Sequence, residues 1–358
     1  NDLRSREFGR TMNRGRQSRI AGLVIAAMAI AAAGAQTVGD LRKKAAPVQV
    51  GPAQAVDPAK VREAYRRFLE LNAGDPEMRA EALRRLADLE LESADAERGD
   101  GTTAAAGGEE TRAAIALYER LLAEAPDHPR IDSVLYQLGR AWEAEGDAER
   151  ALSYLDRLVA KYPNSRHIEE AQFRRGEILF SAKRWPEAEA AYATVIRGGS
   201  GTAFQEQALY KHGWALFKQS RTEESSVSFM AVLDRKLLTS PGVEIESLDK
   251  LSRADRELVE DTMRVLGIQF TADDPARALT VALAKHDSPA YGWRLHASLG
   301  DLLVDKERYT DAADTYRAYA AQHPGDVHSP VLQGRAIDAY LKGGFAELAL
   351  EGKREYVE

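Results

Sequence analysis

The 358-residue chain contains no cysteine. This absence excludes disulfide bonds, thiolate metal sites and the lipid-bearing cysteine of a bacterial lipoprotein. The seven histidines are scattered and none has a metal-ligand spacing such as HExxH. The chain also lacks a GxSxG motif, a P-loop and a Rossmann glycine fingerprint. The sequence therefore predicts no catalytic site, no metal and no cofactor.

A basic surface is also missing. The chain has 49 Lys and Arg against 56 Asp and Glu, a formal net charge of −7, and no stretch gathers Lys and Arg into a cluster. Nucleic-acid binding needs a basic face to neutralise phosphates. We therefore expect no nucleic acid among the partners.

The first 35 residues read as a short leader that ends in an export signal. Three arginines follow Met12, residues 21–33 form an apolar run, and Ala33-Gly34-Ala35 supplies a cleavage site before Gln36. The apolar run is shorter than the roughly 20 residues of a membrane span. We therefore expect a periplasmic protein, with membrane contact only through an uncleaved signal or a partner. The eleven residues before Met12 are interpreted as upstream of the natural start.

Gly139, Gly176 and Gly213 follow one another at intervals of 37 residues. Each lies in the middle of a stretch with helical apolar spacing, and a second such stretch follows each one. A fixed period in this range is typical of stacked helical repeats. Such repeats usually provide binding surfaces.

The residues at fixed offsets within these units resemble the tetratricopeptide repeat family. The best copies are Leu138, Gly139, Trp142, Ala151, Leu155, Leu158 and Pro163, and Leu299, Gly300, Leu303, Ala312, Tyr316 and Pro324. The resemblance covers residues 58–358. It implies an all-α fold in which helix-turn-helix repeats stack into a right-handed superhelix.

The 37-residue period is longer than the usual repeat of this family. In this respect the chain resembles long envelope repeat proteins of Gram-negative bacteria and, more distantly, the lipoprotein of the outer-membrane assembly machine. The missing cysteine departs from that lipoprotein. The resemblance implies a non-enzymatic scaffold that binds other envelope proteins.

Changes in composition and period divide the chain further. The predicted parts are a leader and signal at 1–35, a flexible linker at 36–57, an N-terminal array at 58–236 with a mobile loop at 95–110, an insertion at 237–252, and C-terminal units at 253–358. The last unit is interrupted by the end of the sequence. We therefore interpret the chain as the N-terminal part of a longer protein.

The candidate site is a groove along the first helix of three successive units, where residues not needed for the core would meet a partner segment. The predicted groove residues are Tyr136, Arg140, Phe173, Glu177, Phe180, Tyr210, Trp214 and Phe217. Aromatic residues and arginine commonly anchor interfaces. The alternative interpretation is that contacts between neighbouring repeats bury these rings.

Two other functions stay open. The chain could be a regulatory or targeting arm of a protein whose catalytic domain lies beyond residue 358. It could also be a cytoplasmic co-chaperone-like adaptor, if the segment after Met12 is not a signal.

Overall fold

The computed structural model describes residues 57–71, 75–99, 107–199, 203–240, 242–245 and 247–357. The chain divides into two compact units, residues 1–73 and 74–358. Helix α2 (Pro58–Glu70) is the described element of the first unit, and the Asp57 carboxylate caps its start. The predicted leader and signal, and the predicted linker up to residue 56, lie outside the described residues.

The second unit is a succession of helices, which confirms the all-α prediction. Its helices are α3 (Pro76–Gly99), α4 (Gly108–Glu124), α5 (Ile131–Ala144), α6 (Ala148–Lys161), α7 (Ile168–Ser181), α8 (Trp185–Arg197), α9 (Ala203–Lys218), α10 (Thr222–Leu237), α11 (Arg253–Gln269), α12 (Pro275–Lys285), α13 (Gly292–Asp305), α14 (Tyr309–Gln322), α15 (Ser329–Lys342) and α16 (Ala346–Val357).

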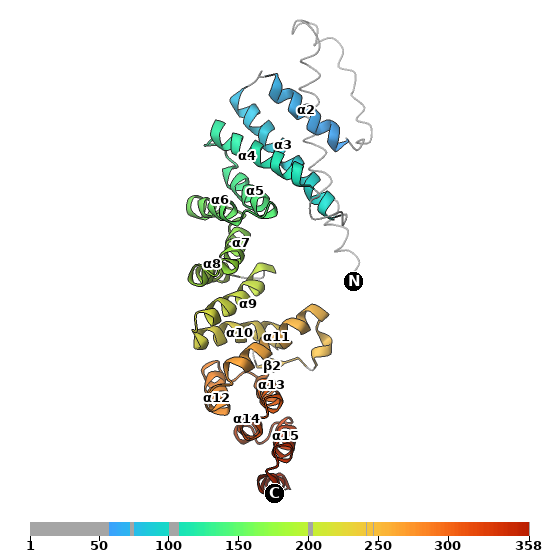
Figure 1. Cartoon of the computed structure of the whole chain (residues 1–358), viewed down its shortest axis with the longest axis vertical. Coiled ribbons are helices and arrows are strands. Elements are labelled where there is room, and N and C mark those ends of the chain that lie inside the picture. The colour runs from blue at the N-terminus through green and yellow to red at the C-terminus, as the bar shows by residue number, and fades with distance from the viewer. Residues whose placement is uncertain are drawn as a thin grey trace. The chain divides into compact units, whose positions relative to one another are not determined.

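These helices form hairpins (Figure 1). We call the odd-numbered helices α3 to α15 the A helices and the even-numbered helices α4 to α16 the B helices. Consecutive helices pack on each other along most of the unit, and A helices also pack on A helices, as α7 does on α9 and α11 on α13. The B helices α12 and α14 pack in the same way. The unit is therefore an all-α solenoid of tetratricopeptide-like hairpins.

The periodic glycines are the points where the two helices of a hairpin come closest. A Cβ atom added at Gly139 would lie 2.7 Å from Leu155, and one added at Gly176 would lie 2.5 Å from the Tyr192 ring. Real Cβ atoms essentially never come within 3.0 Å of a neighbour. Gly213 and Gly300 meet the rings of Phe229 and Tyr316 in the same way. Each partner stands 16 residues after its glycine, so the sequence period reflects one repeated contact.

The hairpin around Gly267 departs from this pattern. A Cβ at Gly267 would meet Leu302 of α13 at 3.3 Å, whereas the regular offset would place it against Leu283. Its A helix, α11, packs on α10 and α13. The contact of this glycine is therefore with the next hairpin.

The turn between the A and B helix of most hairpins contains a residue in the left-handed region. The positions are Gly146, Lys183, Ser220, Glu307 and Gly344, with φ between 59° and 80°. They recur at the 37-residue period. At the other end of the unit, the B helices α4, α6 and α14 end two residues before Pro126, Pro163 and Pro324, which confirms these prolines as stop signals.

The two predicted insertions are more ordered than expected. Residues 95–99 extend α3 and residues 108–110 begin α4, so the predicted loop 95–110 is too long at both ends. The insertion 237–252 contains an antiparallel pair of short strands, β1 (Leu238–Ser240) and β2 (Val243–Glu244), and a 3₁₀ turn, η2 (Leu248–Lys250). The Glu244 carboxylate accepts hydrogen bonds from Trp293 at 2.9 Å and from Arg294. These bonds attach the strand pair to α13.

Candidate functional site

The A helices carry all eight predicted groove residues, and ion pairs join successive A helices. We call these pairs the inter-helix ladder. Its rungs are Asp95–Arg140 at 3.2 Å, Glu143–Arg174 at 2.7 Å, Glu177–Lys211 at 2.7 Å and Asp301–Arg335 at 2.9 Å. All of these side chains are partly exposed. Each rung therefore contributes little alone, about 1 kcal/mol or less, but together the rungs set the register between neighbours.

Two predicted groove residues belong to this ladder. Arg140 bonds Gln137 within its own helix and Asp95 of the previous A helix. Glu177 accepts a hydrogen bond of 2.7 Å from Lys211 and another, of 2.5 Å, from the Tyr192 hydroxyl. Burial and then the bond to Glu177 raise the pKa of Tyr192. Both predicted polar residues are thus engaged in contacts within the chain.

Tyr136 is buried and does not face a groove. Only 6% of its surface is exposed, and its ring stacks on His167 at 4.3 Å with the planes 10° apart. Burial, followed by a hydrogen bond to Glu170, raises its pKa to about 12. For this residue the alternative interpretation, contact with the neighbouring repeat, describes its position.

The other five predicted aromatic residues are half-buried. On α7, Phe173 packs against Phe204 at 5.5 Å, and Phe180 meets the edge of Trp185 at 4.8 Å. The Lys211 ammonium lies 5.6 Å from the Phe180 ring centre. This contact connects the aromatic residues of α7 with α9.

The three aromatic residues of α9 form one cluster around Trp214. Its ring centre lies 6.3 Å from Tyr210, 5.6 Å from Phe217 and 6.0 Å from the buried Phe229. The Tyr210 hydroxyl also donates a hydrogen bond to Asp261 of α11. The cluster therefore joins the core on one side and keeps partly exposed surface on the other. We call Phe173, Phe180, Trp214 and Phe217 the aromatic row.

The structure also contains a small basic cavity that the sequence did not reveal. Its volume is about 60 Å³, and we call it the turn pocket. Arg130 comes from the turn before α5 and Arg166 from the turn before α7, while Arg84 projects from α3. The remaining lining residues are Asp88, Tyr118, Ser133, Val134, Gln137 and His167.

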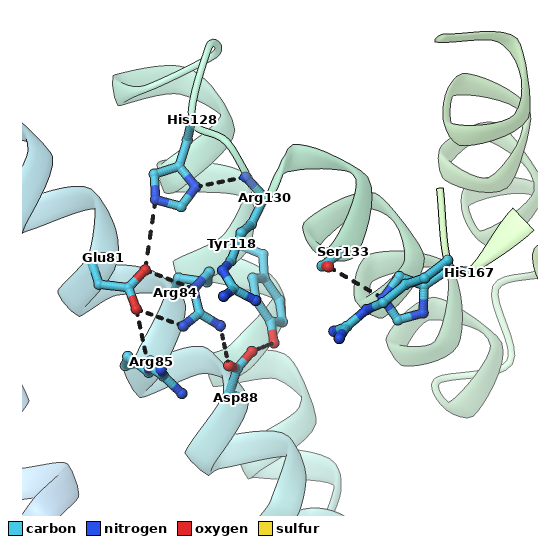
Figure 2. A network of polar contacts seen from close by, with 10 residues as sticks. Glu81, Arg84, Arg85, Asp88, Tyr118, His128, Arg130, Ser133 and His167 are labelled. Carbon is cyan, nitrogen blue, oxygen red and sulfur yellow. Dashed lines mark hydrogen bonds and ion pairs between the residues drawn. The ribbon is translucent and has the colours of Figure 1, made fainter. Parts of the chain in front are cut away.

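Figure 2 shows the polar network around the turn pocket. The Arg84 side chain, 6% exposed, forms two bonds to Glu81, at 2.9 and 2.6 Å, and one to Asp88 at 2.5 Å. Asp88 also accepts a 2.6 Å bond from the Tyr118 hydroxyl. The Glu81 carboxylate accepts a further bond from Arg85 at 3.0 Å. In Figure 2 the Arg130 side chain reaches from the start of α5 toward this network, with Ser133 and His167 beyond it.

Within the described ranges, no group of three or more His, Asp or Glu side chains could hold a metal ion. A search of the same residues also finds no helix long and apolar enough to cross a membrane.

Two segments match models of the tetratricopeptide repeat, residues 133–165 and residues 271–327. The first spans α5 and α6, and the second spans α12 to α14 with the adjoining turns. The chain therefore carries tetratricopeptide repeats. No curated protein matches the sequence.

Solved structures similar to this chain include other repeat proteins. A tetratricopeptide repeat protein from Parabacteroides merdae is 14% identical, with a TM-score of 0.37, and the match covers 76% of this chain and 99% of the other. The C-terminal part of a repeat protein from Cytophaga hutchinsonii is 12% identical, with a TM-score of 0.41 and coverage of 82% and 94%. A double mutant of MamA is 16% identical, with a TM-score of 0.37 and coverage of 66% and 98%.

Proposed function

We propose that this chain is a non-enzymatic protein–protein interaction scaffold of the bacterial cell envelope. It is exported to the periplasm and binds a segment of another envelope protein along its A helices. The export signal predicted at residues 12–35 supports the location. The tetratricopeptide matches support the scaffold, because such repeats typically bind protein partners.

The observation that carries the binding role is the aromatic row on two successive A helices. Each of its rings is half-buried, so its packed side fixes the orientation and its other side stays accessible. A ring fixed in this way loses little side-chain entropy when a partner covers it. Rigid aromatic anchors are the residue type in which binding energy is concentrated.

The inter-helix ladder supplies a polar border to the aromatic row. Glu177 and Lys211 lie between Phe180 and α9. An apolar centre with a charged border is the usual composition of a protein interface. We therefore expect a partner segment with apolar side chains that cover the aromatic row and polar groups toward the ladder.

Site-specific photo-crosslinking in intact envelopes tests this proposal. A photoreactive amino acid is placed at Phe180 or Phe217 of the full chain, and at Val227 as the matched control. Val227 lies on the B helix α10 and is 50% exposed. The proposal expects one partner to be crosslinked from both A-helix positions and not from Val227. It would be refuted by equal crosslinking at all three positions, or by no crosslink from α7 and α9.

The partner identified in this way is then purified and its affinity measured. Phe180→Gln and Phe217→Gln should each weaken binding about tenfold or more, whereas Val227→Gln should leave the affinity unchanged. The location has its own test, because N-terminal sequencing of the periplasmic fraction should find a mature chain that begins at Gln36. A cytoplasmic chain that retains Met12 would contradict export.

A further inference from the structure

The turn pocket contains two arginine side chains that no carboxylate of the described residues neutralises. Glu81, Arg84, Arg85 and Asp88 form a cluster with two positive and two negative charges. This cluster is neutral as a whole. Arg130 and Arg166 lie on the other side of the same cavity, and neither forms an ion pair with a carboxylate in the part of the chain that the structure describes.

The groups around these two arginines leave hydrogen-bond donors unused. The Nε atom of Arg166 donates to Nε2 of His167 at 3.0 Å, so both terminal NH₂ groups of Arg166 stay available. The His167 ring is fixed by its stack on Tyr136. Burial and then the nearby Arg166 lower the pKa of His167, which keeps the ring neutral and its Nε2 able to accept.

Ser133 provides a further donor. Its hydroxyl oxygen lies 3.2 Å from the same Nε2 atom of His167. Because Nε2 has one lone pair, it cannot fully serve both Arg166 and Ser133. The Ser133 hydroxyl can therefore turn toward an acceptor that enters the cavity.

The size and the donors of the cavity define the ligand. One buried water needs about 10–15 Å³ of such volume, so a cavity of about 60 Å³ has room for a few heavy atoms. A carboxylate has about four lone-pair positions. Two guanidinium edges present about four donors in the planar arrangement that carboxylates prefer.

We propose that the turn pocket binds one carboxylate of a partner polypeptide, held by Arg130 and Arg166 and by the Ser133 hydroxyl. That the carboxylate belongs to a polypeptide rests on the scaffold function proposed above. The carboxylate chemistry itself rests only on the cavity. The site lies at the turns before α5 and α7, apart from the aromatic row, and so gives the partner a second point of attachment.

Nuclear magnetic resonance of the arginine Nε–H groups of the full chain at constant ionic strength tests this proposal. The first probe is sodium acetate at pH 7, with sodium chloride as the reference and inorganic phosphate as the competing anion. Acetate should shift the Arg130 and Arg166 signals in a saturable manner. A response that is linear, or the same with chloride, would overturn the proposal. Tighter binding of phosphate than of acetate would also overturn it.

Substitutions show whether these residues hold the anion. Arg130→Gln and Arg166→Gln should each weaken acetate binding about tenfold or more, the loss expected for a charge-assisted bond. Both side chains are exposed, so neither supports the core. Arg235→Gln is the matched control, because Arg235 is an exposed arginine of α10 outside the pocket. Equal affinity in all three variants would refute the assignment.

Three blocked tetrapeptides distinguish the source of the carboxylate. One carries an internal glutamate with an amidated end, one carries a free C-terminal carboxylate, and one carries glutamine with an amidated end. At least one carboxylate peptide should bind tighter than acetate, and the glutamine peptide should not bind. If acetate binds and neither carboxylate peptide does, the polypeptide ligand is refuted. Photo-crosslinking from the aromatic row is a separate measurement, so failure of the scaffold proposal is distinguished from failure of this one.

Discussion

The contact between Gly176 and Tyr192 gives the most direct test of the hairpin packing. In Gly176→Ala the new Cβ atom would lie 2.5 Å from the ring, where ordinary contacts begin at 3.4 Å. Tyr192 is fully buried and its hydroxyl is bonded to Glu177, so the ring cannot move aside. Overpacking of this kind costs about 1–3 kcal/mol.

Helix propensity acts in the opposite direction. Alanine is favoured over glycine inside a helix by about 1 kcal/mol. Gly334 of α15 provides the matched control, because a Cβ added there meets no atom within 4 Å. We expect Gly334→Ala to stabilise the chain by up to about 1 kcal/mol. Because the propensity is common to both changes, Gly176→Ala should be less stable than Gly334→Ala by about 1–3 kcal/mol.

Urea denaturation followed by circular dichroism measures this difference. Neighbouring repeats unfold with partial independence, so hydrogen exchange in α7 and α8 should accompany it. In a Tyr192→Ala background the added Cβ meets no ring, and Gly176→Ala should no longer destabilise. If Gly176→Ala is as stable as Gly334→Ala, the close approach is not what constrains this position.

Three further predictions concern the second half of the chain. Burial lowers the pKa of His296 from 6.5 to about 4, so between these values the unfolded chain takes up a proton that the folded chain does not. Stability should therefore fall as the pH drops from 6.5 to 4, by about 3 kcal/mol, and denaturation of His296→Phe should show a smaller fall. Tyr291→Phe removes the hydroxyl that donates to Asp234 at 2.6 Å and should cost about 1–2 kcal/mol, measured in urea; an unchanged midpoint would contradict this. Glu244→Gln weakens the attachment of the strand pair to Arg294, where both side chains are 14% exposed; it should cost about 2 kcal/mol and speed hydrogen exchange in β1 and β2 before other segments.

The sequence was sufficient for the hairpins because one contact repeats. Gly139, Gly176, Gly213 and Gly300 each meet a side chain 16 residues later, and that constraint is visible as a period. Gly267 kept the residue type but lost the contact, which period alone could not show. The strands β1 and β2 were missed because two or three residues are too short for a strand pattern.

The candidate site was harder to predict. Tyr136 and Trp214 occupy similar places in their helices, yet one is buried against His167 and the other is half-buried. That difference depends on the next hairpin. Arg130 and Arg166 lie in turns that resemble ordinary polar linkers, and they line one cavity only because consecutive turns stack. Pairings across more than 30 residues, such as Glu177–Lys211, also leave no local pattern.

The left-handed turn positions have a consequence for engineering. Glycine occupies two of them, Gly146 and Gly344, while Lys183, Ser220 and Glu307 hold the other three. A residue with a Cβ atom is strained there by about 1–2 kcal/mol, and glycine relieves the strain at an unfolded-state entropy cost of about 0.5–1 kcal/mol. Three mild, independent thermostabilising substitutions are therefore built into the repeat plan, at surface turns where they disturb neither the aromatic row nor the turn pocket.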